Sequence, residues 1–549
     1  MEYVTDIVTG LSWTTWAKLG LALVPPLYGS CSWSFALKLA FVFWVIETIV
    51  VVTYRLTYHP LAKYPGPFFG RITNLYGAWH SFKGDLHLCM HAAHVKYGDV
   101  VRFMPNKVLH NTNTGSRTIY QSAKVKKSND YLVIIPTKGA YSVHTSIDKG
   151  MHARKQKVLM QGLKQESLNA FEPTMLHHVS KFCNIMLQDE GRSAKEWTSP
   201  KDVSHYCDYL ALDIMGSFGF GQDFRMLDQG EYRFLATAIS ASNFRTGIYI
   251  STPYLSKFKL ERLFYPRGYR MRQEFLNLTR RLALERAKLG KDGKKGDLFS
   301  HLIGVKDDAG REFPEHELWS EAKFLIVAGS DTSSTVLTSL FFYLARNKRC
   351  YEIVEREVRT AFSDPSQIHF SAVKESCPYL QACVKEAMRI SPPAGGSMWR
   401  ESEGLVVDGE YMPAGYDIGT SIYALHHKEE YFPRPFEYIP ERWIKPAGEV
   451  NPDFDFVTED SIDKAHSAFH TFSVGSRACI GRMMAYMEIS NTFARIFLTM
   501  EFRKPDGPLG KVGEGRIGMG MGRERESEFQ LEDHLTGTRE GPFIQFRQR

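Results

Sequence analysis

The stretch that decides the fold class is 472–481, which reads FSVGSRACIG and leads directly into RMMAYMEI, a helical pattern that begins at Arg482. Glycines punctuate the first part, so we expect an irregular loop followed by a helix. Cys479 lies at the junction, where the first backbone N–H groups of a helix are free and its dipole is positive. Because both features stabilise a thiolate, the sequence predicts a reactive cysteine here.

A thiolate in such a loop is a candidate axial ligand for haem iron, to which it donates electron density. Arg477 lies two residues away, within reach of a haem propionate. We expect Phe472 to shield the sulfur from water, and Gly475 and Gly481 to let a flat macrocycle approach the backbone. For an isolated cysteine, the simpler alternative is a buried side chain in a glycine-rich turn.

A second segment of interest lies in a long helical pattern that runs from about Leu318 to Ala345 without a proline. Residues 328–332 read AGSDT there, and glycine and hydroxyl residues loosen the hydrogen-bond ladder of a helix and open a local groove. Asp331 and Thr332 supply an acid and an alcohol, which we expect to relay protons. Taken alone, the segment is equally well explained as the polar face of an ordinary helix.

The full pattern Phe-x-x-Gly-x-Arg-x-Cys-x-Gly resembles the haem-binding loop of the cytochrome P450 family, the haem-thiolate monooxygenases. The resemblance implies haem b, with Cys479 as the metal ligand and Arg477, Phe472, Gly475 and Gly481 around it. Residues 328–332 are similar to the family's oxygen-activation segment, in which Asp331 and Thr332 deliver protons to dioxygen.

Two further elements match the family. Glu386 and Arg389 lie three residues apart in the helical pattern 379–390, and the resemblance implies that they form a buried ion-pair network with Arg442. It also implies that Arg400 is a second propionate-binding arginine.

The chain departs from the family pattern at one place. Family members often carry Trp or His followed four residues later by Arg, and both residues contact the haem. This sequence has His152 but Gln156, flanked by Arg154 and Lys157. We expect His152 to contact the haem, and the propionate contact on this side stays open.

An apolar run near the amino terminus predicts a membrane anchor. Residues 35–54 read FALKLAFVFWVIETIVVVTY and are long enough, as a helix, to span a bilayer. The earlier run 13–27 is interrupted by Pro25-Pro26 and is either a second span or an interfacial helix. Basic residues follow the main span, which places the bulk of the chain on the cytoplasmic side. The alternative for the main span is a buried core helix.

Three parts are expected: an anchor over 1–54, a proline-rich hinge over 55–69 and a catalytic domain over 70–549. Long helical patterns dominate that domain, and LVVDGEYM at 405–412 predicts a tight hairpin. The expected fold class is therefore mainly α with small antiparallel β-sheets, a cytochrome P450 fold preceded by a transmembrane anchor.

Composition excludes several classes of protein. Apolar residues make up 43% of the 549, which excludes global disorder. The net charge is +7, but the sequence contains no concentrated run of basic residues of the kind that a nucleic-acid-binding protein has. The eight cysteines are scattered, with no pair at zinc-knuckle or redox spacing, which favours a reducing compartment.

The resemblance to microsomal, fungal-type members implies the activity and its partners. One atom of dioxygen enters a lipophilic substrate, with electrons from an NADPH–cytochrome P450 reductase at the endoplasmic reticulum membrane. The substrate class by analogy is a fungal secondary metabolite, a polyketide, terpenoid or alkaloid. Three alternatives remain: isomerisation or dehydration on the same haem fold, hydroxylation in primary or xenobiotic metabolism, and a non-enzymatic tethered binding protein.

Overall fold

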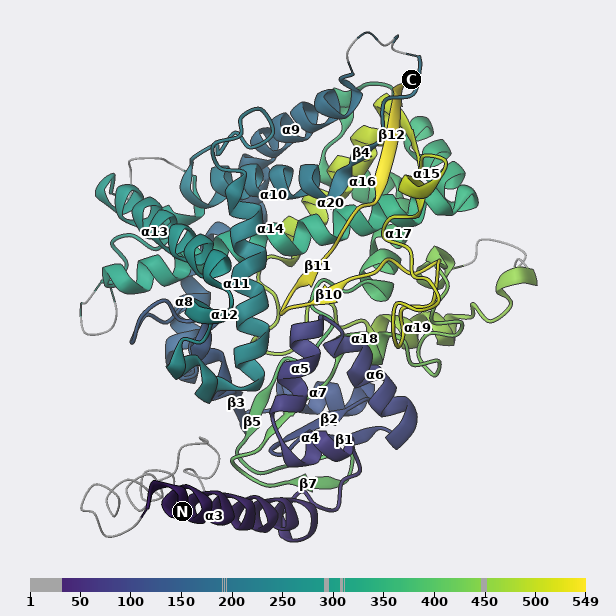
Figure 1. Cartoon of the computed structure of the whole chain (residues 1–549). Helices are drawn as coiled ribbons and strands as arrows, with labels where there is room; N and C mark the ends of the chain where they lie inside the picture. Colours follow the sequence, from purple (N-terminus) through teal and green to yellow (C-terminus); the bar gives the residue numbers. More distant parts are fainter. Residues whose placement is uncertain are drawn as a thin grey trace.

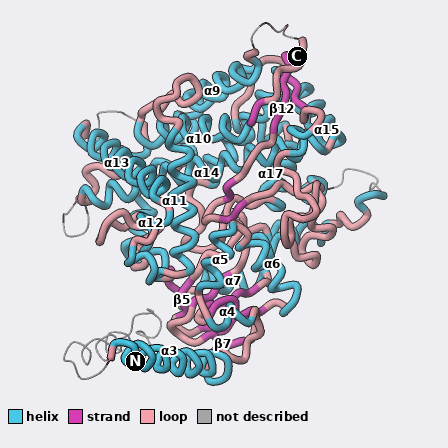
Figure 2. Tube along the Cα trace, viewed as in Figure 1, coloured by secondary structure: helices cyan, strands magenta, loops and turns pink. Residues whose placement is uncertain are grey.

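A computed structural model of the chain describes residues 32–549, apart from 190, 192, 194, 291–295, 307–309, 311 and 446–451. The apolar run 13–27, expected as a second span or an interfacial helix, lies outside the described residues. Helices make up most of the described chain and strands form small sheets, as Figure 2 shows. The expectation of a mainly α protein with small sheets is confirmed.

The predicted anchor is a helix, α3 (Trp33–Thr53), which continues as a π-helical turn over Tyr54–Tyr58. Only 6% of its most apolar window is buried, and Figure 1 shows it lying outside the globular part. The helix therefore extends four residues into the segment expected as a hinge. The chain then turns and docks on the first strand, where the backbone N–H of Arg102 donates to Pro65 O (2.8 Å).

The remaining helices follow one another along the rest of the described chain. They are α4 (Phe68–Ile72), α5 (Leu75–Lys83), α6 (Leu86–Tyr97), α7 (Asn113–Gln121), α8 (Lys149–Gly162), α9 (Gln165–Leu187), α10 (Val203–Phe220), α11 (Phe234–Ser251), α12 (Glu261–Phe264), α13 (Pro266–Lys288), α14 (Glu315–Arg346), α15 (Lys348–Ala361), α16 (Phe370–Ser376), α17 (Pro378–Ile390), α18 (Ile422–His426), α19 (Glu459–Ala468) and α20 (Arg482–Thr499).

Helix α14 crosses the middle of the molecule, as Figure 1 shows, and packs against α10, α13, α17 and α20. It is apolar and long enough to span a membrane, but 67% of its most apolar window is buried in the protein, so it is a core helix. Phe341 at its carboxyl half is fully buried against the rings of Phe493, Phe502 and Phe546. The largest hydrophobic core is therefore built around this helix.

Among the described residues the strands form a five-stranded sheet and three smaller ones. The larger sheet has the order β1-β2-β8-β5-β3, and its pairs are antiparallel except β2 with β8. Most pairs are antiparallel as expected; the parallel pair β2–β8 is the exception, because strands far apart in the chain are not held to the sense that a hairpin imposes. The strands of this sheet are β1 (Val100–Met104), β2 (Lys107–His110), β3 (Val125–Lys127), β5 (Arg400–Ser402) and β8 (Asp417–Gly419).

The predicted hairpin is present as β6 (Leu405–Val407) and β7 (Glu410–Met412). Asp408 and Gly409 between them both have positive φ, +49° and +83°, as a two-residue turn of the I′ type requires. The carboxyl end of the chain closes the fold: β12 (Phe543–Gln548) pairs with β4 (Lys201–Asp202) and β9 (Met500–Arg503), and a short hairpin joins β10 (Glu532–Asp533) to β11 (Gly537–Thr538).

Candidate active site

The cysteine loop is a compact turn that its own backbone closes. The N–H of Cys479 donates to Phe472 O (2.8 Å), and the N–H of Ala478 donates to Gly475 O (3.1 Å). Gly475 has φ +79°, and a Cβ there would lie 2.0 Å from Tyr120 O. The position thus requires glycine because Tyr120 of α7 approaches it; the expected approach of a macrocycle stays a prediction.

Cys479 itself lies beside open space. Of the cysteines that the structure describes it is the only one exposed, and a Cβ on Gly481 would have just the Cys479 Sγ within 4 Å, at 3.9 Å. Burial by the surrounding loop raises the pKa of the thiol, although the N–H of Gly481 and the charge of Arg482 lower it. The helix start and Arg482 therefore stabilise the thiolate as expected, but removal of water around the sulfur has the larger effect and favours the neutral thiol. A metal cation bound at the sulfur would favour the thiolate instead.

Phe472 is half-buried on the helix side of this loop. Its ring packs against Tyr486 with a centroid distance of 5.4 Å, and the Arg482 guanidinium lies 5.8 Å from it. The ring therefore covers the start of α20, and its role as a shield for the sulfur stays a prediction.

A cluster of buried cations lies beside the loop. Strands β3 and β5 pair so that Lys127 stands directly opposite Arg400, with 4% and 5% of the two residues exposed. Burial, and then Arg400 and Arg477, lower the pKa of Lys127 well below its ordinary value. Like charges directly opposite in a sheet destabilise it. Neither Lys127, Arg400 nor Arg477 forms an ion pair with a carboxylate among the described residues.

The two arginines of this cluster use backbone oxygens instead. Arg477 donates to Ser146 O (2.7 Å) and Ile147 O (3.2 Å), and Arg400 donates to Trp399 O (3.1 Å) and Met398 O (3.2 Å). Uncompensated buried charge is costly, so this arrangement calls for an anionic group.

Helix α8 brings His152 to the same cluster. Burial, and then Arg477, Lys127 and Arg400, lower the pKa of this imidazole to about 4, so it is neutral at physiological pH. Gln156, one turn later, donates from its amide to Ser476 O (3.0 Å) in the cysteine loop. The structure therefore brings together His152, Arg400, Arg477 and the cysteine loop from separate parts of the chain.

In α14 the two predicted proton-relay residues face different partners. The Thr332 hydroxyl donates to Ala328 O (2.7 Å), one turn back in a helix that is unbroken over its whole length. The Asp331 carboxylate instead accepts from Asn243 Nδ2 (3.0 Å) on α11 and from the Thr536 hydroxyl. Burial raises the pKa of Asp331 to about 6, against the opposing charge of Arg539.

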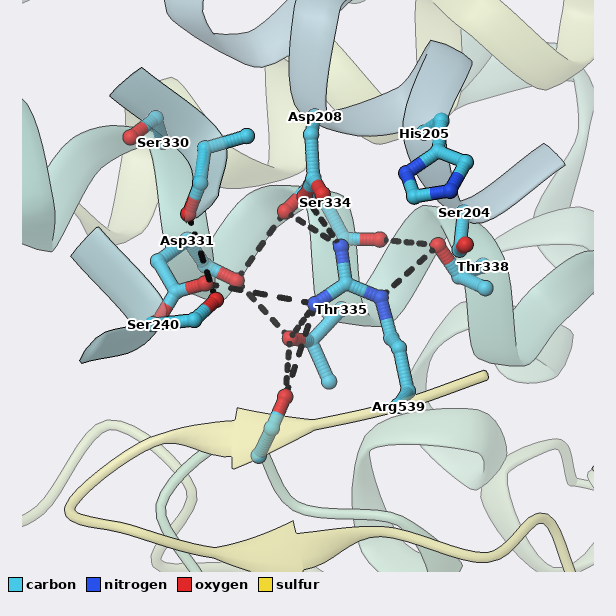
Figure 3. Close-up of polar contacts among 12 residues, drawn as sticks. Ser204, His205, Asp208, Ser240, Ser330, Asp331, Ser334, Thr335, Thr338 and Arg539 are labelled. Atoms are coloured by element: carbon cyan, nitrogen blue, oxygen red, sulfur yellow. Dashed lines mark hydrogen bonds and ion pairs between the residues drawn. The ribbon is translucent and has the colours of Figure 1, made fainter. Parts of the chain in front are cut away.

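The buried side chain of Arg539 contacts both α10 and α14 near Asp331, as Figure 3 shows. Its guanidinium donates to Asp208 of α10 (2.5 Å) and to the hydroxyls of Ser334 (2.8 Å), Thr335 (2.9 Å) and Thr338 (3.2 Å) of α14. The residue comes from the segment between β11 and β12, so the carboxyl end of the chain ties α10 to α14 beside Asp331.

The predicted ion-pair network is present and fully buried. Glu386 accepts from Arg389 at both oxygens (2.9 Å each), from Arg442 Nε (3.0 Å) and from Trp443 Nε1 (2.9 Å). Burial opposes ionisation of Glu386, but Arg389 and Arg442 outweigh it and hold its pKa below the ordinary value.

This network reaches the cysteine loop through one histidine. His426 Nδ1 donates to Arg389 O (3.3 Å), while its Nε2 accepts from the N–H of His470 (3.0 Å), just before the loop. The role expected for Glu386, Arg389 and Arg442, which is to hold the loop rather than to react, fits this connection.

Sequence reasoning missed Lys127 in the cation cluster and the neighbouring His144, and it missed Asn243, Thr536 and Arg539 around Asp331. A weak signal existed for Lys127, because strand alternation places it on the same face as the apolar Val125. The others come from distant segments and carry no local signal.

With this geometry in hand, comparison with known proteins is decisive. The family model described as Cytochrome P450 matches residues 60–521 of the chain. The chain belongs to the cytochrome P450 family. It is an enzyme of the monooxygenase type, and the family implies a haem-thiolate cofactor.

Curated relatives of this cytochrome P450 cover nearly its whole length. "Cytochrome P450 monooxygenase AKT7" of Alternaria alternata is 35% identical over 95% of this chain and 98% of its own. "Cytochrome P450 monooxygenase apf7" of Gibberella fujikuroi is 34% identical over 91% of this chain and 96% of its own. "Cytochrome P450 monooxygenase poxM" of Penicillium oxalicum is 34% identical over 93% and 94%.

The residues present fit a haem. Cys479 offers an accessible sulfur at the start of a helix, and Gly481 leaves the space next to it free. The buried cations Lys127 and Arg400 and the half-buried Arg477 form no ion pair with a carboxylate among the described residues, and haem carries two propionates that supply such a partner. The donor set of this P450 therefore matches the cofactor that its family implies.

Proposed function

We propose that this cytochrome P450 inserts one atom of dioxygen into a lipophilic small molecule of fungal secondary metabolism, a polyketide, terpenoid or alkaloid. Two electrons come from an NADPH–cytochrome P450 reductase. The net reaction consumes a C–H bond, dioxygen, two electrons and two protons, and yields an alcohol and water. The observation that carries the proposal is the accessible Cys479 sulfur beside buried cations that lack a carboxylate partner among the described residues.

The proposed cofactor is haem b, with Cys479 as its metal ligand. Arg400 and Arg477 bind the propionates, and His152 contacts the haem from α8 as a neutral hydrogen-bonding group, in keeping with its lowered pKa. Phe472 limits access of water to the sulfur, Gly481 leaves room beside it, and Gly475 supports the loop by admitting α7.

A haem held by a cysteine thiolate, when bound, activates dioxygen and promotes cleavage of its O–O bond. In the proposed mechanism Thr332 donates a proton from its hydroxyl once this is released from Ala328 O. Asp331 holds a proton at its carboxyl, which a pKa of about 6 supports, and Asn243 and Thr536 orient that group. The cysteine loop holds the sulfur in place through its own backbone hydrogen bonds.

The proposed location is the endoplasmic reticulum membrane, with the catalytic domain on the cytoplasmic side. An anchor over 1–54, a hinge over 55–69 and a catalytic domain over 70–549 is the proposed organisation. The exposed apolar surface of α3 supports the anchor. The family match from residue 60 supports a catalytic part that begins soon after it.

The substrate is proposed to bind near α14 among apolar side chains. Phe324 lies one turn before Ala328 and stacks on His144 with a centroid distance of 5.2 Å. Leu325 is buried, so it serves the core. Further substrate contacts are proposed in 131–146, in 239–249, after Ser391 and in the glycine-rich segment 507–522.

The test uses the detergent-solubilised full chain. Ferrous protein with carbon monoxide should give the red-shifted Soret band of a thiolate–carbonyl haem, and Cys479→Ala should abolish it, while Cys350→Ala at a buried cysteine should retain it. Product formation from a panel of lipophilic metabolites should require NADPH, reductase and dioxygen. Turnover without dioxygen would indicate isomerisation or dehydration instead, and a colourless protein would indicate a binding protein.

A further inference from the structure

Three basic side chains from three helices meet near the amino-terminal half of α14. Lys323 comes from α14, Arg245 from α11 and Arg272 from α13, and these helices pack against one another. Lys323 is buried, with only 6% of the residue exposed, and Arg272 is half-buried. The mechanism proposed above uses none of the three, and burial of a cation without a use for it is costly.

The carboxylate nearest this group is already engaged. Glu261 of α12 accepts from Arg245 Nε (3.0 Å) and from the Tyr249 hydroxyl (2.6 Å). Neither Lys323 nor Arg272 forms an ion pair with a carboxylate among the residues that the structure describes. Burial, and then Arg272 and Arg245, lower the pKa of Lys323 to about 7, and no described carboxylate opposes them.

The ammonium group of Lys323 instead meets a segment that the proposed function assigns to the substrate. Its Nζ donates to Ile134 O (2.5 Å), and Arg245 Nη1 donates to the neighbouring Val133 O (3.4 Å). Both oxygens lie in one of the segments proposed above to contact the substrate, and Arg245 lies in another. Because an ammonium group carries three hydrogens, the bond to one carbonyl oxygen leaves Lys323 able to bind an anion.

We propose that Lys323 binds a carboxylate of the substrate, with Arg272 adding a second positive charge nearby. The inference rests on the proposed function and narrows its substrate class to lipophilic carboxylic acids, such as an acid of polyketide type. A basic alkaloid is disfavoured, because both residues repel its ammonium group.

The position of Lys323 along α14 fits a substrate that is held at one end and oxidised further along. Lys323 precedes Asp331 by eight residues and Thr332 by nine, which corresponds to about 12–14 Å along a helix. The apolar residues Phe324 and Val327 lie between these positions. A substrate whose carboxylate binds Lys323 therefore presents to the proposed proton donors a carbon remote from its acid group.

Two substitutions and a matched control follow from this arrangement. Lys323→Met keeps the length of the lysine stem and removes a charge that burial makes costly, so the fold should be retained. Arg272→Met removes the second charge. Arg270→Met is the control, because Arg270 lies on the same helix two residues earlier and is exposed. It removes one positive charge from α13 without reaching the buried group.

The experiment measures binding of ω-imidazolyl alkanoic acids to the detergent-solubilised ferric full chain. The imidazole of such a probe binds haem iron and shifts the Soret band, whatever the natural substrate is. In a series of increasing chain length, the wild type should bind its best acid about 10- to 100-fold more tightly than the methyl ester, because the ester has no charge to pair with Lys323. Lys323→Met should bind acid and ester equally, Arg272→Met should lose part of the preference, and Arg270→Met should match the wild type.

Three results would overturn the assignment. Equal affinity of the wild type for acid and ester would show that no cation recognises a carboxylate there. An unchanged preference in Lys323→Met would assign it to another residue, and an equal loss of affinity for acid and ester would indicate a loosened site. In each case a retained Soret shift and thiolate–carbonyl band would leave the proposed function intact, whereas a wild-type chain that shows neither would refute that function itself.

Discussion

Asp331 and Thr332 are neighbours in the sequence, yet their side chains bond to different parts of the protein. The Thr332 hydroxyl stays within α14, at Ala328 O, while the Asp331 carboxyl is held by α11 and by the carboxyl-terminal segment. A proton relay through both residues therefore requires that each release its present partner. Their separate partners allow the two roles to be tested separately.

Thr332→Ala should divert electrons from product to hydrogen peroxide, because the hydroxyl that passes a proton to dioxygen is lost. Coupling, measured as product formed per NADPH consumed, should fall at least about 10-fold. Ser330→Ala is the control, since Ser330 makes the same kind of bond one turn back, to Ile326 O (2.5 Å). Equal coupling in Thr332→Ala and the wild type would remove Thr332 from the relay.

The pH profile of product formation should report the Asp331 carboxyl. Its pKa is raised to about 6, so the proton-donating acid form predominates below pH 6 and is lost above it. Turnover per bound haem should therefore decline as pH rises through 6. Asp331→Asn should give a lower rate that does not decline over this pH range. If turnover of Asp331→Asn still declined as pH rises through 6, the titrating group would be another residue.

Residues close together in the sequence are predictable, and residues joined only by the fold are not. Cys479, Arg477 and Phe472 lie within one short loop, whose pattern of residues is enough to indicate the ligand. Lys127 lies opposite Arg400 only through strand register, which no local pattern specifies. The sequence predicts Gly475 as a site residue, but it gives no sign of the approach of Tyr120 O, because that contact comes from a distant helix.

At the scale of elements, the sequence predicts the ends of helices and strands accurately where proline or a turn sequence marks them. Helix α17 runs from Pro378 to Ile390, as the flanking prolines predict, and the Asp408-Gly409 turn forms the expected hairpin. Helix α14 starts at Glu315, earlier than its apolar pattern, because its first turn is polar. The anchor helix ends late, at Tyr58, since no residue before His59 breaks it.

Glu386→Gln should destabilise the fold and release haem. It leaves Arg389 and Arg442 buried without their carboxylate, which costs about 3–5 kcal/mol in the free energy of unfolding. Urea unfolding and decay of the thiolate–carbonyl band measure the two effects. Glu437→Gln, which breaks the exposed pair with Arg434, should stay within about 1 kcal/mol of the wild type. Equal effects of the two substitutions would contradict the structural role of the network.

At the scale of the whole molecule, apolar side chains are exposed on α3 and also on the catalytic part, as a group of mainly aromatic residues. The second group lies on α4, α5 and α12, where α5 packs against α11 and Phe82 meets Phe244 (5.7 Å). Its members include Phe68, Phe69, Trp79, Phe82, Leu263 and Phe264. Contiguous apolar surface of this kind is typical of a membrane contact.

Deletion of residues 1–58 should release most of the protein from membranes, because it removes the whole exposed apolar helix. A fraction should remain bound through the aromatic group, and Phe264→Ser in the truncated chain should lower that fraction further. Sedimentation with microsomes at low and high salt measures both. Full retention of the truncated protein would show that α3 is not the main anchor.

The position of Arg539 has a consequence for how the chain is made. This arginine lies beyond the last residue of the family match, and it is the group that fastens α10 to α14 beside Asp331. A ribosome delivers it after the whole cysteine loop, so the nascent polypeptide holds a complete loop before α14 is secured. A premature stop codon after Thr538 would therefore yield a product that retains every recognisable motif but leaves Asp208 and three hydroxyls of α14 without their shared cation.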